Sequence, residues 1–231
     1  MNDGENASAI IRVLDDAAAV AREARAHIEA CARRCIAANG AFRLVLAGGT
    51  TPLAVYRDLA RRPPDTGGWE IFFGDERCLA PEHADRNSRA AGQAWLDASG
   101  IPASRIHAIP AELGPEEGAR RYAREIEHWQ PFDLVLLGMG EDGHVASLFP
   151  GHGHPEADAV VGVTGAPKPP PERVSLNYGT ICAARERLLI VTGSAKRDAV
   201  AAWQQGAMLP VARVAECGAG TVLLDRAAAP V

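Results

Sequence analysis

The sequence lacks a run of apolar residues long enough for a membrane span, and its first residues lack the apolar core of a signal peptide. Its formal net charge is −5, which argues against a nucleic-acid-binding surface but leaves room for a local basic pocket. We therefore predict a cytoplasmic protein that binds neither membranes nor nucleic acid.

Several catalytic patterns are also missing. No G-x-S-x-G nucleophile elbow occurs, which argues against a serine hydrolase, and no H-E-x-x-H pair occurs, so we predict no metal. A nucleophilic role for Cys78 is less economical than an inert, half-buried thiol. The cysteines are odd in number, scattered and without a CxxC pair, which predicts reduced thiols at Cys31, Cys35, Cys78, Cys182 and Cys217.

What is present is an alternation of buried strands and helices. Short apolar runs typical of buried parallel strands occur at 43–47, 69–73, 133–137, 187–192 and 221–224. Helical patterns separate them, beginning with residues 15–38. No repeat or linker interrupts the 231 residues. We predict one α/β domain over residues 1–231, with a doubly wound, mostly parallel, Rossmann-like sheet and helices on both faces.

A glycine-rich loop follows the run at 133–137. Gly138, Gly140 and Gly143 surround two acids and lead to His144, which could hold a proton near neutral pH. The glycines also spell the dinucleotide pattern G-x-G-x-x-G. However, Pro150 stops any following helix, so we expect no dinucleotide.

Three further loops follow predicted strands. Residues 48–52 form a glycine-rich turn that opens a helix, which suits an anion, although the P-loop lysine is missing. Residues 74–77 end in Arg77, and residues 193–196 end in Lys196. Each could be a plain turn or a solvated surface, but ligands of open α/β sheets bind at such strand ends. Together the loops suit a small phosphorylated substrate and a general acid or base.

The long stretch 151–172 is rich in glycine and proline. Loops of this length often act as lids, and the sequence leaves open whether this stretch is one.

The motifs LAGGTTP, GDERCLAPEHADRNS, GMGEDGHVASLFP and the pair RVSLN and VTGSAK occur in this order along most of the chain. Together they resemble the motifs of the 6-phosphogluconolactonase family, whose fold superfamily includes glucosamine-6-phosphate deaminase. Deaminases usually read DEY where this chain reads DER at 75–77, and FNEP where it reads SLFP at 147–150. Both differences favour the lactonase. One departure is Val145, where the family commonly has threonine.

The resemblance implies hydrolysis of 6-phosphoglucono-1,5-lactone, a step of the pentose phosphate pathway, without a cofactor. His144 would be the general base and Asp142 would orient it. Gly49, Thr50, Arg77 and Lys196 would hold the phosphate, with Arg173 a weaker candidate. The full set of substrate-binding residues expected is Gly48, Gly49, Thr50, Thr51, Asp75, Glu76, Arg77, Asn87, Gly140, Gly143, Arg173 and Lys196.

Two other functions stay open on the sequence. One is a deaminase or isomerase acting on an amino sugar phosphate, and the other is a non-catalytic module that senses a sugar phosphate. For the assembly we expect a monomer or a weak homo-oligomer.

Overall fold

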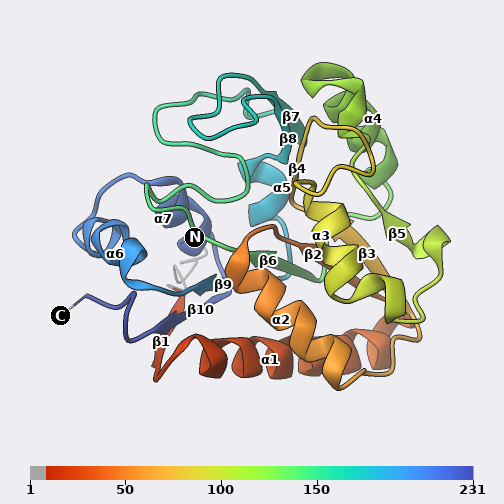
Figure 1. The fold of residues 1–231 in the computed structure, drawn as a ribbon, viewed down its shortest axis with the longest axis horizontal. Coiled ribbons are helices and arrows are strands. Elements are labelled where there is room, and N and C mark those ends of the chain that lie inside the picture. Colours follow the sequence, from red (N-terminus) through yellow and green to blue (C-terminus); the bar gives the residue numbers. More distant parts are fainter. Residues whose placement is uncertain (1–8, 231) are drawn as a thin grey trace, which may run out of the picture.

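The computed structural model describes residues 9–230. Residues 1–8, where we expect no signal peptide, lie outside the described part. Seven strands form one sheet in the order β1-β10-β9-β6-β2-β3-β5, and all neighbours are parallel (Figure 1). Their bounds are β1 Ile10–Leu14, β2 Phe42–Leu46, β3 Trp69–Phe73, β5 Ile106–His107, β6 Leu134–Leu137, β9 Glu186–Val191 and β10 Gly220–Asp225.

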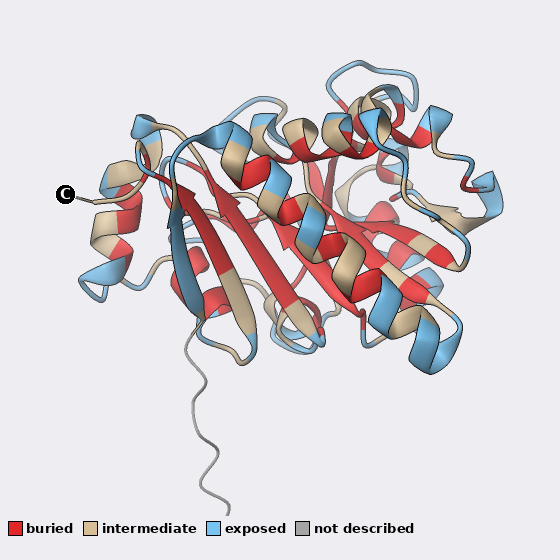
Figure 2. Ribbon diagram, turned by 90° about the horizontal axis from the view of Figure 1, so that it is seen from below, coloured by how far each residue is buried: buried red, intermediate tan, exposed pale blue. Residues whose placement is uncertain are grey.

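Helices cover the sheet on both faces, with α1 and α2 on one side and α5 and α7 on the other (Figure 1). Figure 2 shows the central strands as a buried layer beneath these helices. The predicted mostly parallel α/β architecture is confirmed. The helices are α1 Ala17–Asn39, α2 Thr50–Arg61, α3 Asn87–Ala94, α4 Pro115–Ile126, α5 Tyr178–Cys182, α6 Arg197–Gln204 and α7 Pro210–Ala215.

The first helix shows how the sequence dictates these elements. The Asp16 carboxylate accepts a hydrogen bond from the amide of Ala19, which satisfies one of the free donors at the start of α1. Val20, Ala24 and Ile28 recur at helical spacing and are buried against the sheet. Gly40 ends the helix with a φ of 74°, a conformation that glycine adopts without strain.

A second, antiparallel sheet was not predicted. It has the order β4-β8-β7 and comprises β4 Asp75–Arg77, β8 Arg173–Leu176 and β7 Val160–Val163. Residues 74–77 were expected as a loop, and 151–172 as irregular throughout. The extended pattern that the sequence shows at 173–176 is confirmed as β8, but strands as short as β4 and β7 leave too little periodicity to detect. Pairing of β4 with β8 sets Arg77 opposite Arg173, so the small sheet brings two cations together.

The cysteine prediction is wrong for one pair. Cys182, at the end of α5, and Cys217, after α7, form a disulfide with their Cα atoms 5.6 Å apart. Cys31, Cys35 and Cys78 are free, as expected. The pair lies 35 residues apart in the sequence, and only the packing of α5 against α7 brings the two residues together.

Within residues 9–230, no helix is both long and apolar enough to cross a membrane. The same residues contain no group of three or more His, Cys, Asp or Glu side chains arranged to hold a metal ion.

Near the disulfide, one buried arginine joins several segments. Arg187 is 1% exposed, and its guanidinium donates to the carbonyl oxygens of Cys182, Ala184, Val214 and Ala219 at 2.9–3.2 Å. Burial lowers the pKa of its side chain. These bonds tie α5 and the segment after α7 to strand β9.

We predict that Arg187→Met destabilises the protein by more than about 3 kcal/mol, because it leaves several buried carbonyl groups without donors. The measurement is the free energy of unfolding from urea titration. Arg226→Met is the control: Arg226 is exposed and pairs with the exposed Asp15, so its loss should cost less than about 1 kcal/mol. Equal losses in the two variants would contradict the assigned role of Arg187.

Candidate active site

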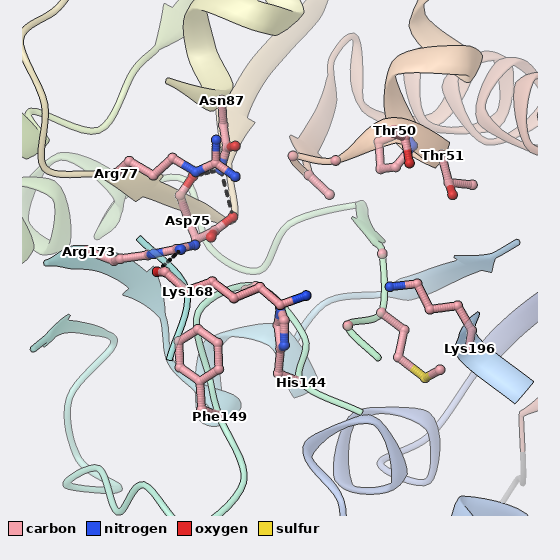
Figure 3. A pocket seen from close by; sticks show the side chains of 18 of the residues that line it. Thr50, Thr51, Asp75, Arg77, Asn87, His144, Phe149, Lys168, Arg173 and Lys196 are labelled. Carbon is pink, nitrogen blue, oxygen red and sulfur yellow. Dashed lines mark hydrogen bonds between the residues drawn. The ribbon is translucent and has the colours of Figure 1, made fainter. Parts of the chain in front are cut away.

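A pocket of about 300 Å³ opens where the loops after β2, β3, β6 and β9 meet. The carboxyl ends of parallel strands share one edge of the sheet, so residues distant in sequence converge there. Figure 3 shows the side chains that surround it. Eleven of the fourteen predicted site residues line it: Gly48, Gly49, Thr50, Thr51, Asp75, Arg77, Asn87, Gly140, His144, Arg173 and Lys196.

His144 is held by Asp142, two residues before it. Nδ1 of His144 lies 2.5 Å from Oδ1 of Asp142, and the same oxygen accepts from the His144 amide at 3.2 Å. A carboxylate only accepts hydrogen bonds, so Nδ1 carries the proton and Nε2 is left as the proton acceptor. A Cβ atom on Gly140 would stand 2.0 Å from Nδ1, so glycine is required there.

The surroundings of His144 and Asp142 lower the pKa of both side chains. Burial lowers the pKa of His144, although the Asp142 carboxylate acts in the opposite direction. Burial alone would raise the pKa of Asp142, but attraction to His144 and hydrogen bonds from it lower the pKa below its usual value. Near neutral pH, the site therefore holds an uncharged imidazole next to an ionised carboxylate, an arrangement suited to general base catalysis.

Asp75 forms the opposite wall. It is 6% exposed, and its oxygens accept hydrogen bonds from Asn87 Nδ2 at 3.0 Å and from Ser147 Oγ at 2.7 Å. Burial raises its pKa. Asn87 in turn packs so closely on the loop after β2 that a Cβ on Gly48 would lie 2.0 Å from its Oδ1. Asp75 and Asn87 therefore fix the shape of this wall (Figure 3).

Glu76 does not line the pocket, which corrects its prediction as a substrate-binding residue. It is fully buried, and its carboxylate accepts from the amides of Arg77, Asn87 and Ser88 at 2.7–2.9 Å. Arg86 lies 3.4 Å away as an ion-pair partner. Side chains alternate across a strand, so Glu76 points away from the face that carries Asp75 and Arg77. It satisfies free amides at the start of α3 instead.

Gly143 also lies outside the pocket lining. Its φ of 80° makes the turn that delivers His144, and its carbonyl oxygen accepts from the amide of Val211 at 3.0 Å. Asp142, the third predicted residue that does not line the pocket, acts behind His144. These two residues position the imidazole.

Four cationic side chains line the pocket: Arg77, Lys168, Arg173 and Lys196. Arg77 donates to the Asp85 carbonyl oxygen at 2.6 Å, and burial lowers the pKa of Lys196. Helix α2 begins at Thr50, so its first amides also face this space with the positive end of the helix dipole. The arrangement favours an anionic ligand.

The sequence analysis missed Lys168, Met139 and Phe149 as lining residues. The Phe149 ring packs against His144 with 4.6 Å between ring centres. Lys168 belongs to the long stretch 151–172, where no periodic pattern marks individual residues.

Comparisons with known proteins agree on one family. The family model described as glucosamine-6-phosphate isomerases/6-phosphogluconolactonase matches residues 15–224. A 6-phosphogluconolactonase of Mycobacterium leprae is 35% identical over 228 residues, which cover 92% of each chain. One of Streptomyces coelicolor is 38% identical and covers 91% of this chain and 92% of its own.

Solved structures give the same result. The 6-phosphogluconolactonase of Thermotoga maritima superposes with a TM-score of 0.87 at 26% identity, covering 94% of this chain and 100% of its own. A monomeric glucosamine-6-phosphate deaminase, at 20% identity and a TM-score of 0.82 over 95% of this chain and 98% of its own, shares the fold. The chain belongs to the glucosamine-6-phosphate isomerase/6-phosphogluconolactonase family.

Proposed function

We propose that the protein hydrolyses 6-phosphoglucono-1,5-lactone to 6-phosphogluconate, a step of the pentose phosphate pathway. The observation that carries this proposal is the imidazole of His144, held by Asp142 at 2.5 Å in a pocket that four cationic side chains line. The relatives at 35% and 38% identity are 6-phosphogluconolactonases, which supports the same reaction.

The reaction needs one proton shuttle. Nε2 of His144 takes a proton from a water molecule whose oxygen attacks the C1 carbonyl of the lactone. The tetrahedral intermediate then expels the ring oxygen, which receives that proton from the imidazolium. Asp142 keeps the ring oriented and stabilises its charged form between the two transfers. The chemistry uses only water and this chain's side chains.

The phosphate would bind at the start of α2, where Gly49 and Thr50 line the pocket. Lys196 and Arg77 would neutralise its charge from the loop after β9 and from β4. Val145, the departure from the family pattern, is fully buried and does not line the pocket. A missing hydroxyl at this position therefore leaves the proposed contacts intact.

One feature favours the lactonase over the deaminase. Phe149 stands in the segment where deaminases usually read FNEP, and its apolar ring contacts His144. The histidine therefore has a carboxylate partner on its Asp142 side and an apolar neighbour at this position.

Four ideas from the sequence are kept as proposals. We infer one domain, since the apolar residues of both sheets belong to one buried cluster. Location in the cytoplasm and a monomer or weak homo-oligomer also stay proposals, as does a lid role for residues 151–172.

We predict that the protein releases one acid equivalent per turnover from freshly made lactone in a pH-stat, above spontaneous hydrolysis and with EDTA present. His144→Ala should lower kcat at least about 100-fold because the general base is lost. His83→Ala, an exposed histidine outside the pocket, is the control with unchanged kcat. Ammonia release from glucosamine 6-phosphate without lactone hydrolysis would favour the deaminase, and ligand binding with neither reaction would favour the sensor.

A second prediction concerns pH. The pKa of His144 is lowered from 6.5, so kcat/KM should stay high down to below pH 6.5 and fall only as the imidazole becomes protonated. Asp142→Asn removes a charge that raises this pKa, so the acid limb should move to still lower pH while kcat drops. The measurement is the pH profile of kcat/KM. An acid limb displaced to higher pH in Asp142→Asn would contradict the assignment.

A third prediction concerns the phosphate. Arg77→Met should weaken binding of 6-phosphogluconate about 10-fold or more and leave the affinity for gluconate unchanged, as measured by calorimetry. Added salt should weaken wild-type binding, and more so than in the variant. Arg120→Met, an exposed cation outside the pocket, is the control. Wild-type affinity for 6-phosphogluconate in Arg77→Met would remove Arg77 from the phosphate site.

A further inference from the structure

The distribution of lysine in this chain is unusual. The sequence contains 22 arginines and only two lysines, Lys168 and Lys196. Both line the same pocket, although they come from segments far apart in the chain. An ammonium is a compact charge with three donors that can rotate around one anion, whereas a guanidinium is a rigid planar fork. Every other cationic side chain apart from histidine is an arginine, including Arg77 and Arg173 of this pocket, so both ammonium groups of the lysines gather at one site.

The backbone at Lys168 is held in place by Arg173. The Arg173 side chain is 6% exposed, and its Nη2 donates to the Lys168 carbonyl oxygen at 2.8 Å while its Nε donates to that of Pro170 at 3.1 Å. Burial lowers the pKa of this guanidinium, although Asp75 acts against that effect. Arg173, a weaker candidate phosphate ligand, therefore uses two of its three side-chain nitrogens to fix the segment that carries Lys168. We regard it as a positioning residue.

The side chain of Lys168 extends from the Arg173 side of the pocket toward Lys196 (Figure 3). Its Nζ lies 3.5 Å from Oε2 of Glu141, and both side chains are more than half exposed. Burial lowers the pKa of Lys196, Glu141 raises it and Lys168 lowers it, so the three charges act on one another. Glu141 directly precedes Asp142, which places this cluster beside the catalytic histidine.

We propose that Lys168 is a further ligand of the substrate phosphate, opposite Lys196, and that Glu141 competes with the phosphate for it. A phosphate monoester carries a charge of about −1.5 to −2 near neutral pH and offers three acceptor oxygens, so it can accept hydrogen bonds from Lys168 as well as from Lys196 and Arg77. An exposed ion pair of the Lys168–Glu141 kind contributes less than about a tenfold factor to an equilibrium. A phosphate held by two ammonium groups and the α2 amides can therefore displace Glu141. The inference rests on the proposed function for the identity of the substrate.

The first test is calorimetric titration of the full chain with 6-phosphogluconate, inorganic phosphate and gluconate. Lys168→Met should weaken binding of 6-phosphogluconate and of inorganic phosphate at least about 5-fold, and leave gluconate unchanged. Glu141→Gln should strengthen binding of both phosphorylated probes about 2- to 5-fold, because the competitor is neutralised. In the double variant, the gain from Glu141→Gln should disappear.

Two matched controls come from exposed ion pairs outside the pocket. Arg226→Met removes a cation from the pair with Asp15, and Glu156→Gln neutralises the partner of Arg213. Both should bind all three probes as the wild type does. Wild-type affinity for phosphate in Lys168→Met, an equal loss for gluconate, or a gain from Glu141→Gln that persists without Lys168 would overturn the proposal.

The scarcity of lysine allows a second test. An amine-selective acylating reagent can modify only Lys168, Lys196 and the chain's amino terminus, and peptide mass spectrometry resolves the three. Saturating 6-phosphogluconate should slow modification of both lysines at least about 5-fold and leave the amino terminus unchanged. Protection of Lys196 alone would overturn the role of Lys168.

The tests separate this inference from the proposed function. A wild-type protein that binds 6-phosphogluconate and protects both lysines, but does not hydrolyse the lactone, would contradict the function and support the phosphate ligand. If the wild type hydrolyses the lactone but Lys168→Met binds phosphate as the wild type does, the result would support the proposed function and contradict the role of Lys168. Failure of the wild type to bind either phosphorylated probe would overturn the inference.

Discussion

The carboxylate of Asp75 joins the parts of the chain that surround the pocket. It stands on β4, directly after β3, and accepts hydrogen bonds from Asn87 at the start of α3 and from Ser147 in the loop after β6. A buried carboxylate is costly unless its oxygens are satisfied, so these partners are constrained as well. Through Asn87 the constraint reaches Gly48, where no side chain larger than hydrogen fits. The pocket wall thus forms as one unit.

On the opposite side of the pocket, nearby charges and burial set the pKa of His144. Burial and the nearby ammonium of Lys196 both lower the pKa of His144, whereas Asp142 and Asp75 raise it. A phosphate bound to Lys196 would cancel the effect of that ammonium and raise the pKa of the imidazole. Substrate binding would then make His144 a stronger base at the moment when a base is needed.

The sequence predicted the parts of this arrangement that depend on continuous patterns. Strand β6 and the other central strands are mostly apolar runs, and the glycine-rich loop after β6 ends in His144, so both the strand ends and a histidine that lines the pocket could be located. The direction of a side chain in a short polar strand has no such pattern. Glu76 therefore appeared equivalent to Asp75, although it points to the opposite side and binds amides of α3.

Contacts between segments that are distant in the sequence could not be predicted from it either. The Cys182–Cys217 disulfide depends on the packing of α5 against α7, and the place of Lys168 depends on carbonyl groups that Arg173 binds. Neither is encoded in local spacing. One signal for Lys168 was present in the composition, because a chain with two lysines among its cations sets both of them apart.

The fold itself does not decide between the reactions of this family, because a deaminase shares it at a TM-score of 0.82. The decision lies in a few side chains at the pocket. Phe149 packs against the His144 ring on one side, and the Arg173 guanidinium lies 5.9 Å from the centre of the Phe149 ring. An acid in place of this phenyl ring would lie within reach of both the guanidinium and the imidazole. It would raise the pKa of His144 and give it a second carboxylate partner. The apolar ring at position 149 therefore keeps Asp142 as the carboxylate hydrogen-bonded to the imidazole.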